Sequence, residues 1–209
     1  MENNNEEYLK SIFDCFKKLD YINPDEIPNI DLYMDQVTTF MDEHLQASKR
    51  YSEDKLLTKT MINNYTKNNL LPSPNKKKYS KEHMLLLIFI YYFKNILSIS
   101  DIQSIFNPLT EKYYGEKSDI GLETIYKEVF KNQNEQIDAL VKDVIRKYNK
   151  SRESFPDAQP EEDREFLKTF SFICMLSFDV YIKKQMIEKI IDDTLTDKAK
   201  EEKKEKKET

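Results

Sequence analysis

Glycine is scarce in this sequence: Gly115 and Gly121 are the only two among 209 residues. Tight β-turns depend on glycine for backbone with positive φ, so a chain this poor in glycine is unsuited to a fold of many hairpins. The shortage also excludes a glycine-rich phosphate loop and a dinucleotide-binding fingerprint, which need several glycines close together. The sequence therefore predicts an all-α fold and excludes the common nucleotide-binding enzymes.

Cysteine and histidine are also scarce, with two of each. Cys15 and Cys174 lie in apolar helical patterns, which predicts buried free thiols in a reducing compartment. His44 and His83 have no cysteine near them, and the motifs HExxH, GxSxG and CxxC do not occur. We therefore expect a protein that is not an enzyme and has no catalytic residue, no metal site and no cofactor.

One carboxylate stands in an apolar run: Asp179, in the segment LSFDVY that begins at Leu176. A buried acid in such a setting can be catalytic. More often it pairs with a nearby cation, and Lys183, four residues further along the same helix, is the candidate partner.

Long apolar segments are missing as well. The longest uncharged apolar stretches, residues 84–93 and 169–178, are about half as long as the roughly 20 residues that span a bilayer. The first residues contain no basic and apolar signal segment. We expect a cytoplasmic protein that does not contact membranes.

Positive charge is concentrated in one segment, although the whole chain has a formal net charge of −5. Residues 49–95 hold ten lysines and arginines against three acids, whereas residues 1–48 hold three lysines against eleven acids. Such asymmetry indicates an anionic partner at the basic segment. The alternative is that the acidic N-terminal segment neutralises the basic one within the fold.

Apolar residues at helical spacing predict a helical bundle with four regions. Residues 1–29 are an acidic helix (6–19) and a linker. Residues 30–109 hold a helix capped by Asp31, a polar helix at 59–69, an apolar helix after Ser80 and a short helix capped by Ser100 that ends before Pro108. Residues 110–195 contain two long helices, 122–148 and 161–195, and residues 196–209 are a charged tail that we expect to be disordered.

The most informative stretch is residues 58–106, where Thr58 caps the polar helix. Met61, Ile62 and Tyr65 can face inward, which leaves a set of polar side chains facing out: Lys59, Thr60, Asn63, Asn64 and Lys67. Asparagine is a poor helix former, but its side chain can bond an adenine edge through two hydrogen bonds. The alternative is a solvated helix on an ordinary helical domain.

A proline-containing loop follows this helix. Pro72 and Pro74 force extended backbone, so the loop presents three lysines, Lys76, Lys77 and Lys78, ahead of Tyr79. A basic loop beside a polar helix suits a small DNA-binding module.

The last long helix is more apolar than one buried face requires. Its apolar residues, from Phe166 to Ile187, are spread over several sides. Either the other helices wrap it in a single bundle, or part of its surface pairs with a second copy of the chain.

The segments TMINNY (60–65), LLP (70–72), KYS (78–80) and SISDI (98–102) resemble, in content and order, the MerR-type winged helix-turn-helix. Residues from about 30 to 193, including SFDVYIKK (177–184), resemble a bacterial family of uncharacterised proteins, domain-of-unknown-function family 1836. Two departures stand out: Asn69 replaces the glycine that usually precedes Leu-Leu-Pro, and lysines replace the arginines usual in the wing.

The resemblance implies a DNA-binding transcriptional regulator that binds double-stranded DNA through a helix-turn-helix with a short wing. Its DNA-binding residues would be Lys59, Thr60, Asn63, Asn64, Lys67, Lys76, Lys77, Lys78 and Tyr79. A homodimer on a two-fold operator is expected because one such unit is small, and no small-molecule ligand is implied. The alternative, favoured by the net negative charge, is a non-enzymatic helical interaction or scaffold module that no longer binds DNA.

Overall fold

The computed structural model describes residues 10–11, 13, 22–115 and 118–196. The chain divides into two compact units, one of Met1–Phe16 with Asn132–Ile187 and one of Lys17–Lys131 with Glu188–Thr209. Most of the helix expected at 6–19, Cys15 and the tail from residue 197 lie outside the described residues.

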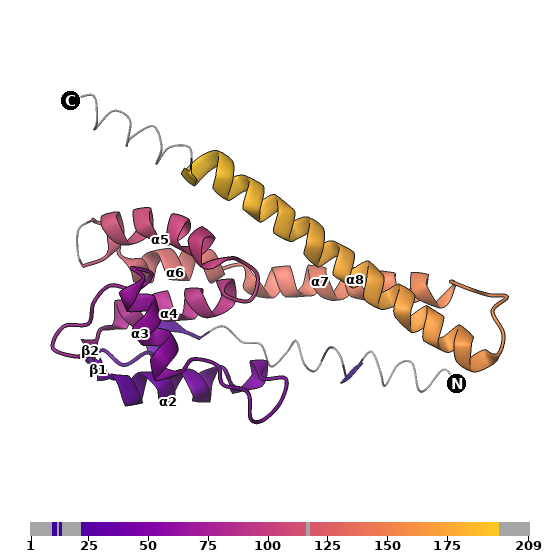
Figure 1. Cartoon of the computed structure of the whole chain (residues 1–209), viewed down its shortest axis with the longest axis horizontal. Helices are drawn as coiled ribbons and strands as arrows, with labels where there is room; N and C mark the ends of the chain where they lie inside the picture. The colour runs from indigo at the N-terminus through magenta and orange to yellow at the C-terminus, as the bar shows by residue number, and fades with distance from the viewer. Residues whose placement is uncertain (1–9, 12, 14–21, 116–117, 197–209) are drawn as a thin grey trace. The chain divides into compact units, whose positions relative to one another are not determined.

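The structure is all-α, as predicted, apart from one two-stranded sheet (Figure 1). The unit around Lys17–Lys131 contains η1 (Pro24–Glu26), β1 (Leu32–Tyr33), α2 (Met34–His44), η2 (Gln46–Ser48), α3 (Lys59–Lys67), β2 (Lys78–Tyr79), α4 (Lys81–Phe93), α5 (Ile99–Tyr113) and α6 (Leu122–Phe130). The other unit contains α7 (Gln133–Arg152) and most of α8 (Glu161–Ile191), and a short π-helical turn, η3 (Asp192–Thr196), follows α8.

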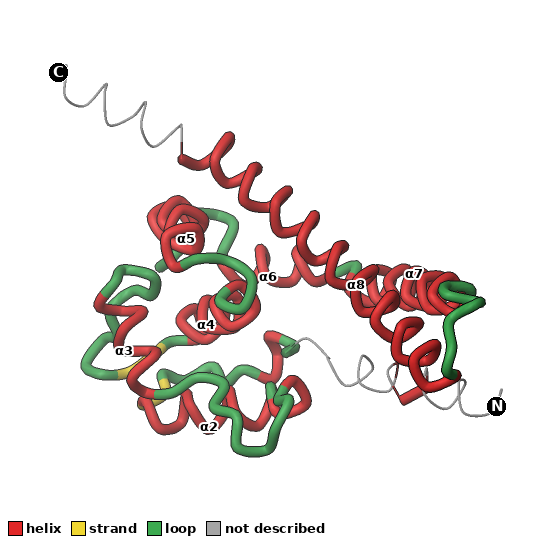
Figure 2. The backbone as a smooth tube through the Cα atoms, turned by 45° about the vertical axis from the view of Figure 1, so that its right-hand side comes forward, coloured by secondary structure: helices red, strands yellow, loops and turns green. Residues whose placement is uncertain are grey.

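Helix α4 is the centre of its unit. Every residue from His83 to Tyr91 is buried, because a helix that is apolar all round must be covered on every side. Figure 2 shows α4 with α2, α3, α5 and α6 around it. Phe89 of α4 lies edge-on to Tyr126 of α6, with ring centroids 5.2 Å apart.

A two-stranded sheet, which periodicity did not predict, fastens the proline-containing loop to the segment before α2. Strand β1 runs antiparallel to β2, with Leu32 opposite Tyr79 and Tyr33 opposite Lys78. Leu32 and Tyr79 are buried, whereas Tyr33 is exposed, so one face of this small sheet faces the core. Pairing with β2 also explains why α2 begins at Met34 and is not capped by Asp31.

Helix α5 differs from its prediction at both ends. Ser98, and not Ser100, caps it: the N–H of Asp101 donates to Ser98 Oγ and the N–H of Ser98 donates to Asp101 Oδ2, both at 3.2 Å. The helix continues through Pro108 to Tyr113. Proline removes one backbone hydrogen bond, but the burial of Ile102 and Phe106 on this helix keeps it intact.

The helix expected at 122–148 is two helices. Asn132 has φ −103° and ψ 19°, which separates α6 from α7. Helix α6 packs on α4, so its compact unit extends to Lys131, beyond the boundary that the sequence predicts after residue 109. Helix α7 continues to Arg152 in the other unit.

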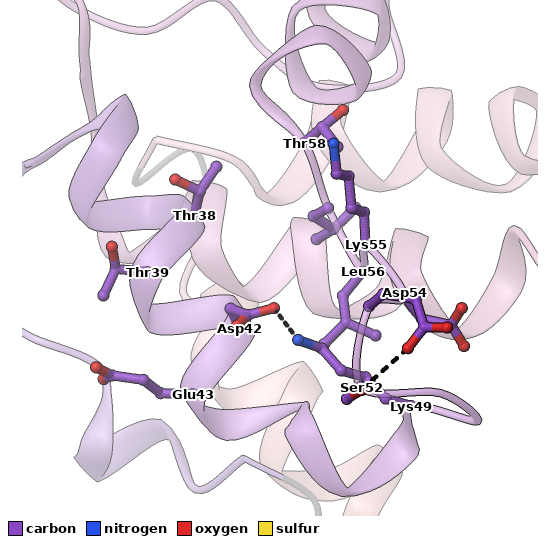
Figure 3. A pocket seen from close by; sticks show the side chains of 12 residues that line it. Thr38, Thr39, Asp42, Glu43, Lys49, Ser52, Asp54, Lys55, Leu56 and Thr58 are labelled. Atoms are coloured by element: carbon purple, nitrogen blue, oxygen red, sulfur yellow. Dashed lines mark hydrogen bonds and ion pairs between the residues drawn. The ribbon is translucent and has the colours of Figure 1, made fainter.

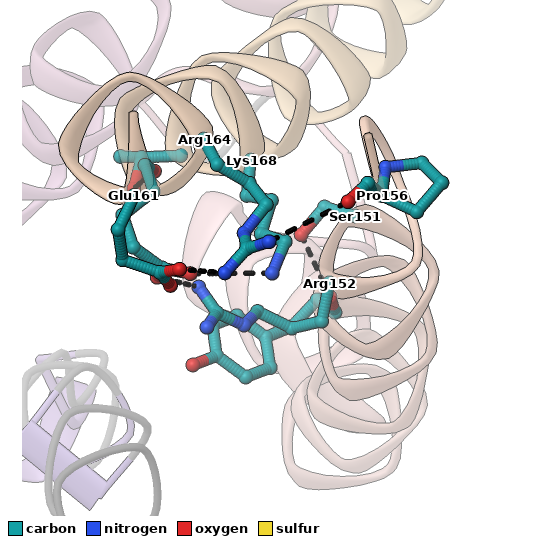
Figure 4. Close-up of polar contacts among 9 residues, drawn as sticks. Ser151, Arg152, Pro156, Glu161, Arg164 and Lys168 are labelled. Carbon is teal, nitrogen blue, oxygen red and sulfur yellow. Dashed lines mark hydrogen bonds and ion pairs between the residues drawn. The ribbon is translucent and has the colours of Figure 1, made fainter. Parts of the chain in front are cut away.

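Helices α7 and α8 pack through a small apolar cluster of Val144, Tyr148 and Phe172, with Phe13 and Leu176 against it. Polar contacts close the end near the α7–α8 loop (Figure 4). There Arg152 donates to Glu165 at 2.6 Å, and this guanidinium, aided by Lys168, holds the pKa of Glu165 below its usual value.

Two sequence predictions about α8 are corrected. Asp179 pairs with Lys147 of α7, which also pairs with Asp143, and not with Lys183. The pair therefore joins two helices, which a neighbour on the same helix could not do. Cys174 is exposed and not buried, because it lies on the side of α8 away from the buried Phe172. Among the described residues, no helix combines the length and apolar character needed to cross a bilayer.

Candidate nucleic-acid interface

Helix α3 presents a continuous polar face. Thr58 Oγ1 accepts from the N–H of Met61 at 3.2 Å and starts the helix, while Ile62 and Tyr65 are buried. This orientation leaves five predicted DNA-binding residues exposed: Lys59, Thr60, Asn63, Asn64 and Lys67. The structure therefore brings the predicted residues of this helix together on one accessible surface.

Asparagine residues determine how the C-terminal end of α3 terminates. Asn69 has φ 58°, the left-handed conformation that glycine takes most easily and asparagine tolerates. The N–H groups of Leu70 and Leu71 then donate to Tyr65 O at 2.8 and 3.3 Å, and both leucines are buried. Gln103 of α5 donates to Asn68 O at 2.5 Å, which attaches this end of α3 to α5.

The loop between α3 and α4 ends in a tight turn of lysines, which we call the lysine turn (residues 75–78). The N–H of Lys78 donates to Asn75 O at 2.9 Å. The two central residues, Lys76 and Lys77, have φ 49° and 67°, the pattern of a type I′ turn. This turn usually takes Asn-Gly or Gly-Gly, because residues with a Cβ are strained there.

The side chains of this loop differ in accessibility. Lys76 and Lys77 are exposed, and Lys78 is half-buried with its Nζ 5.2 Å from the centre of the Tyr33 ring. Tyr79 is only 3% exposed and belongs to the core. Its predicted contact with DNA is therefore corrected to a supporting position beneath the loop, because its strand pairing turns its ring inward.

Acidic residues neutralise part of the basic segment. Lys59 pairs with Asp35, Lys49 with Asp42 at 2.7 Å, and Lys81 with Glu123 at 2.8 Å. Within the described part of the chain, no carboxylate forms an ion pair with the other four predicted cations: Lys67, Lys76, Lys77 and Lys78. The net positive surface is therefore smaller than the charge count suggests and is centred on the lysine turn and the end of α3.

A pocket of about 500 Å³ lies beside this surface, between α2 and residues 49–58 (Figure 3). Its charged lining consists of four acids and two lysines: Asp42, Glu43, Glu53, Asp54, Lys49 and Lys55. Hydrogen bonds from the backbone and from Ser52 hold the pKa of Glu53 below its usual value. A pocket with this excess of carboxylates repels phosphate, so we place it outside the candidate interface.

The match to a known family covers residues 22–130, and the family model is described as a domain of unknown function, DUF1836. No curated protein and no solved structure matches the chain significantly. The match runs from Ile22, two residues before η1, to the end of α6, so it includes the polar face of α3 and the lysine turn. It ends before α8, so the late segment 177–184, which shares in the resemblance seen in the sequence, lies outside it. Because the match covers more than half of the 209 residues, the chain belongs to the DUF1836 family.

Proposed function

We propose that this protein is a DNA-binding transcriptional regulator that contacts double-stranded DNA through α3 and the lysine turn. The observation that carries the proposal is the pair Lys76 and Lys77 in left-handed backbone at an exposed turn. Lysine is strained in this conformation, and both side chains are exposed, so burial of these side chains does not offset the strain. A phosphate backbone is the partner that two adjacent exposed ammonium groups suit.

Helix α3 would enter the major groove. Asn63 and Asn64 are exposed in its middle, where an amide side chain can bond the N6 and N7 edge of adenine. Lys59, Thr60 and Lys67 surround them and would contact phosphates or bases. The lysine turn would lie on the flanking backbone as a short wing.

The order β1–α2–α3–wing–α4 supports a MerR-like winged helix-turn-helix as the form of this interface. One feature departs from the simplest motif. Residues 45–58 join α2 to α3, whereas a plain helix-turn-helix has a turn of about three or four residues. We infer a variant of the motif with an enlarged turn that includes η2.

We further propose that the regulator acts as a homodimer. Helix α8 carries an exposed apolar surface through which two copies could pair. Four apolar side chains at spacings of four, three and seven residues are more than half exposed: Phe166 (68%), Phe170 (53%), Ile173 (54%) and Val180 (63%), and the equally exposed Tyr181 (57%) flanks the last of them. This spacing is that of a coiled-coil seam. If each side chain buries about 100 Å², two copies bury about 1,000 Å², near the lower limit for a stable interface.

Charge favours an antiparallel arrangement of the two α8 helices. The seam begins after three acids, Glu161–Asp163, and ends at Lys183 and Lys184. Antiparallel pairing centred near Ile173 and Cys174 places Asp163 of one copy opposite Lys184 of the other, whereas parallel pairing places like charges together.

A salt titration of binding to a random duplex tests the DNA proposal. Each phosphate contact contributes about 0.9 to the slope of log affinity against log salt concentration. We expect wild-type protein to bind with a slope of several units, and replacement of Lys76, Lys77 and Lys78 by alanine to lower it by up to about 2.7. Retention on neither duplex nor heparin at low salt would instead favour the interaction module, for which the exposed apolar seam of α8 is the supporting feature.

A further inference from the structure

The helix that follows the lysine turn begins with an unusual capping arrangement. Ser80 is the N-cap of α4, and His83 occupies the third helical position. The N–H of Ser80 donates to His83 Nδ1 at 3.0 Å, and Ser80 Oγ lies 2.9 Å from the same nitrogen. In a capping box this position normally holds glutamate or glutamine, so His83 adds a titratable imidazole to the box.

His83 contacts both ends of the loop that carries the lysine turn. At the start of the loop, the backbone at Pro72 and Ser73 lies near the ring and acts to raise its pKa. At its end, the Tyr79 ring lies edge-on to the imidazole at 5.4 Å and Ser80 donates to Nδ1. One buried side chain, 2% exposed, therefore lies next to both ends of this loop.

The remaining neighbours of the imidazole come from two other segments. Tyr114, after α5, places its hydroxyl 3.0 Å from Nε2 and 3.2 Å from Nδ1. Asp31, before β1, acts on the ring through its charge. Glu82 lies beside this group on α4 and accepts from the N–H of Gly115 at 3.2 and 3.1 Å.

These contacts specify one protonation state. Nδ1 accepts the Ser80 N–H, so it carries no proton and the ring is the neutral tautomer protonated at Nε2. Burial lowers the pKa of His83, and it outweighs the backbone at Pro72 and Ser73 and the charge of Asp31, which act in the opposite direction. A proton added to Nδ1 would set two donors, this N–H and that of Ser80, against each other.

We propose that His83 is a positioning residue of the DNA interface: its neutral imidazole holds both ends of the loop that presents Lys76 and Lys77, and protonation at Nδ1 releases that loop. The inference rests on the proposed function and adds pH control to it. Because the folded state favours the neutral ring, the contribution of His83 is complete above its ordinary pKa of 6.5 and is lost as the pH falls below that value.

The test uses the two histidines of the chain as experiment and control. Affinity for a random duplex is measured by fluorescence anisotropy at about pH 7.5 and pH 5.5, for wild type, His83→Gln and His44→Gln. Glutamine retains the acceptor and donor of the box but does not titrate. We expect wild type and His44→Gln to lose affinity severalfold on acidification, because the protonated ring no longer accepts from the N–H of Ser80. His83→Gln should bind alike at both pH values.

A second variant shows whether the effect passes through the lysine turn. Lys76→Ala with Lys77→Ala should bind more weakly at both pH values and show no acid-dependent loss, because the released loop then carries no phosphate contact from these positions. An acid-dependent loss that persists in this variant, or in His83→Gln, would overturn the inference.

A third measurement separates this inference from the proposed function. Amide exchange of the Ser80 N–H is followed in the full-length protein at both pH values. We expect its protection to fall on acidification in wild type and to persist in His83→Gln. If no duplex is bound at any pH, the proposed function fails, but the exchange result still decides the His83 arrangement. Protection that is equal in both proteins at low pH would refute it.

Discussion

Lys59, the first residue of α3, is ion-paired with Asp35, in the first turn of α2. The pair fixes the two helices to each other at the start of the proposed DNA-contacting helix. Both side chains are more than half exposed, so the pair contributes at most about 1 kcal/mol to stability. A phosphate can therefore replace Asp35 as the partner of Lys59 at little cost.

Replacing the acid of this pair should strengthen DNA binding. Asp35→Asn removes a negative charge beside the phosphate backbone and leaves Lys59 available, so we expect affinity for any duplex to rise about two- to fivefold. Asp138→Asn on α7 removes the same charge at an exposed position outside the interface and should leave affinity unchanged. Equal gains in both variants would show that only net charge matters, and that Lys59 has no specific contact.

The lysine turn should show opposite effects on stability and binding. Lys76→Asn with Lys77→Gly supplies the residues that a type I′ turn prefers, so thermal or urea unfolding should show a gain of about 1–2 kcal/mol. The same variant loses two proposed phosphate contacts, so its salt slope should fall by up to about 1.8. Lys142→Gln with Lys150→Gln on α7 is the charge-matched control. If the variant is more stable and its affinity and salt slope are unchanged, the lysine turn is not part of the DNA interface.

The two asparagines in the middle of α3 should contribute to sequence preference. Once a cognate site is found by genomic footprinting, Asn63→Ala or Asn64→Ala should cost about 1–3 kcal/mol on that site and little on random duplex. Alanine is the better helix former at these exposed positions, so a loss of binding would not come from a weaker helix. Equal losses of affinity on both duplexes would show that this asparagine helps to position the protein on DNA and does not read a base.

The apolar seam of α8 should bring two copies together. Light scattering at micromolar concentration should give twice the 25.0 kDa mass of the chain, and Phe170→Glu should halve it. Ile120→Glu, at an exposed apolar residue outside α8, is the control. A monomeric wild type would exclude the proposed dimer.

The antiparallel arrangement has its own signature. In a Cys15→Ser background, Cys174 lies near the two-fold axis, so mild oxidation should join two copies through a disulfide. Failure to cross-link while the protein is a dimer would exclude the pairing centred near Ile173 and Cys174.

Much of the fold could be predicted because local signals decide it. The Thr58 cap, the buried side chains of α3 and the apolar run of α4 follow from spacing and capping chemistry, and the structure confirms them. The exposure of Asn63, Asn64, Lys59 and Lys67 followed from the same spacing. Where local signals compete, as at Ser98 and Ser100, only the geometry of the capping box decides between them.

By itself, the sequence determined the helical class, the basic segment and the polar face of α3, because each depends on residues within a few turns of one another. Only the tertiary structure decided that Leu32 pairs with Tyr79, that Lys147 and not Lys183 binds Asp179, and that His83 lies edge-on to Tyr114. These contacts join residues that are distant in the chain or that are separated by a loop whose conformation the sequence does not specify. They stabilise the protein only after the chain has folded, so no local sequence pattern predicts them.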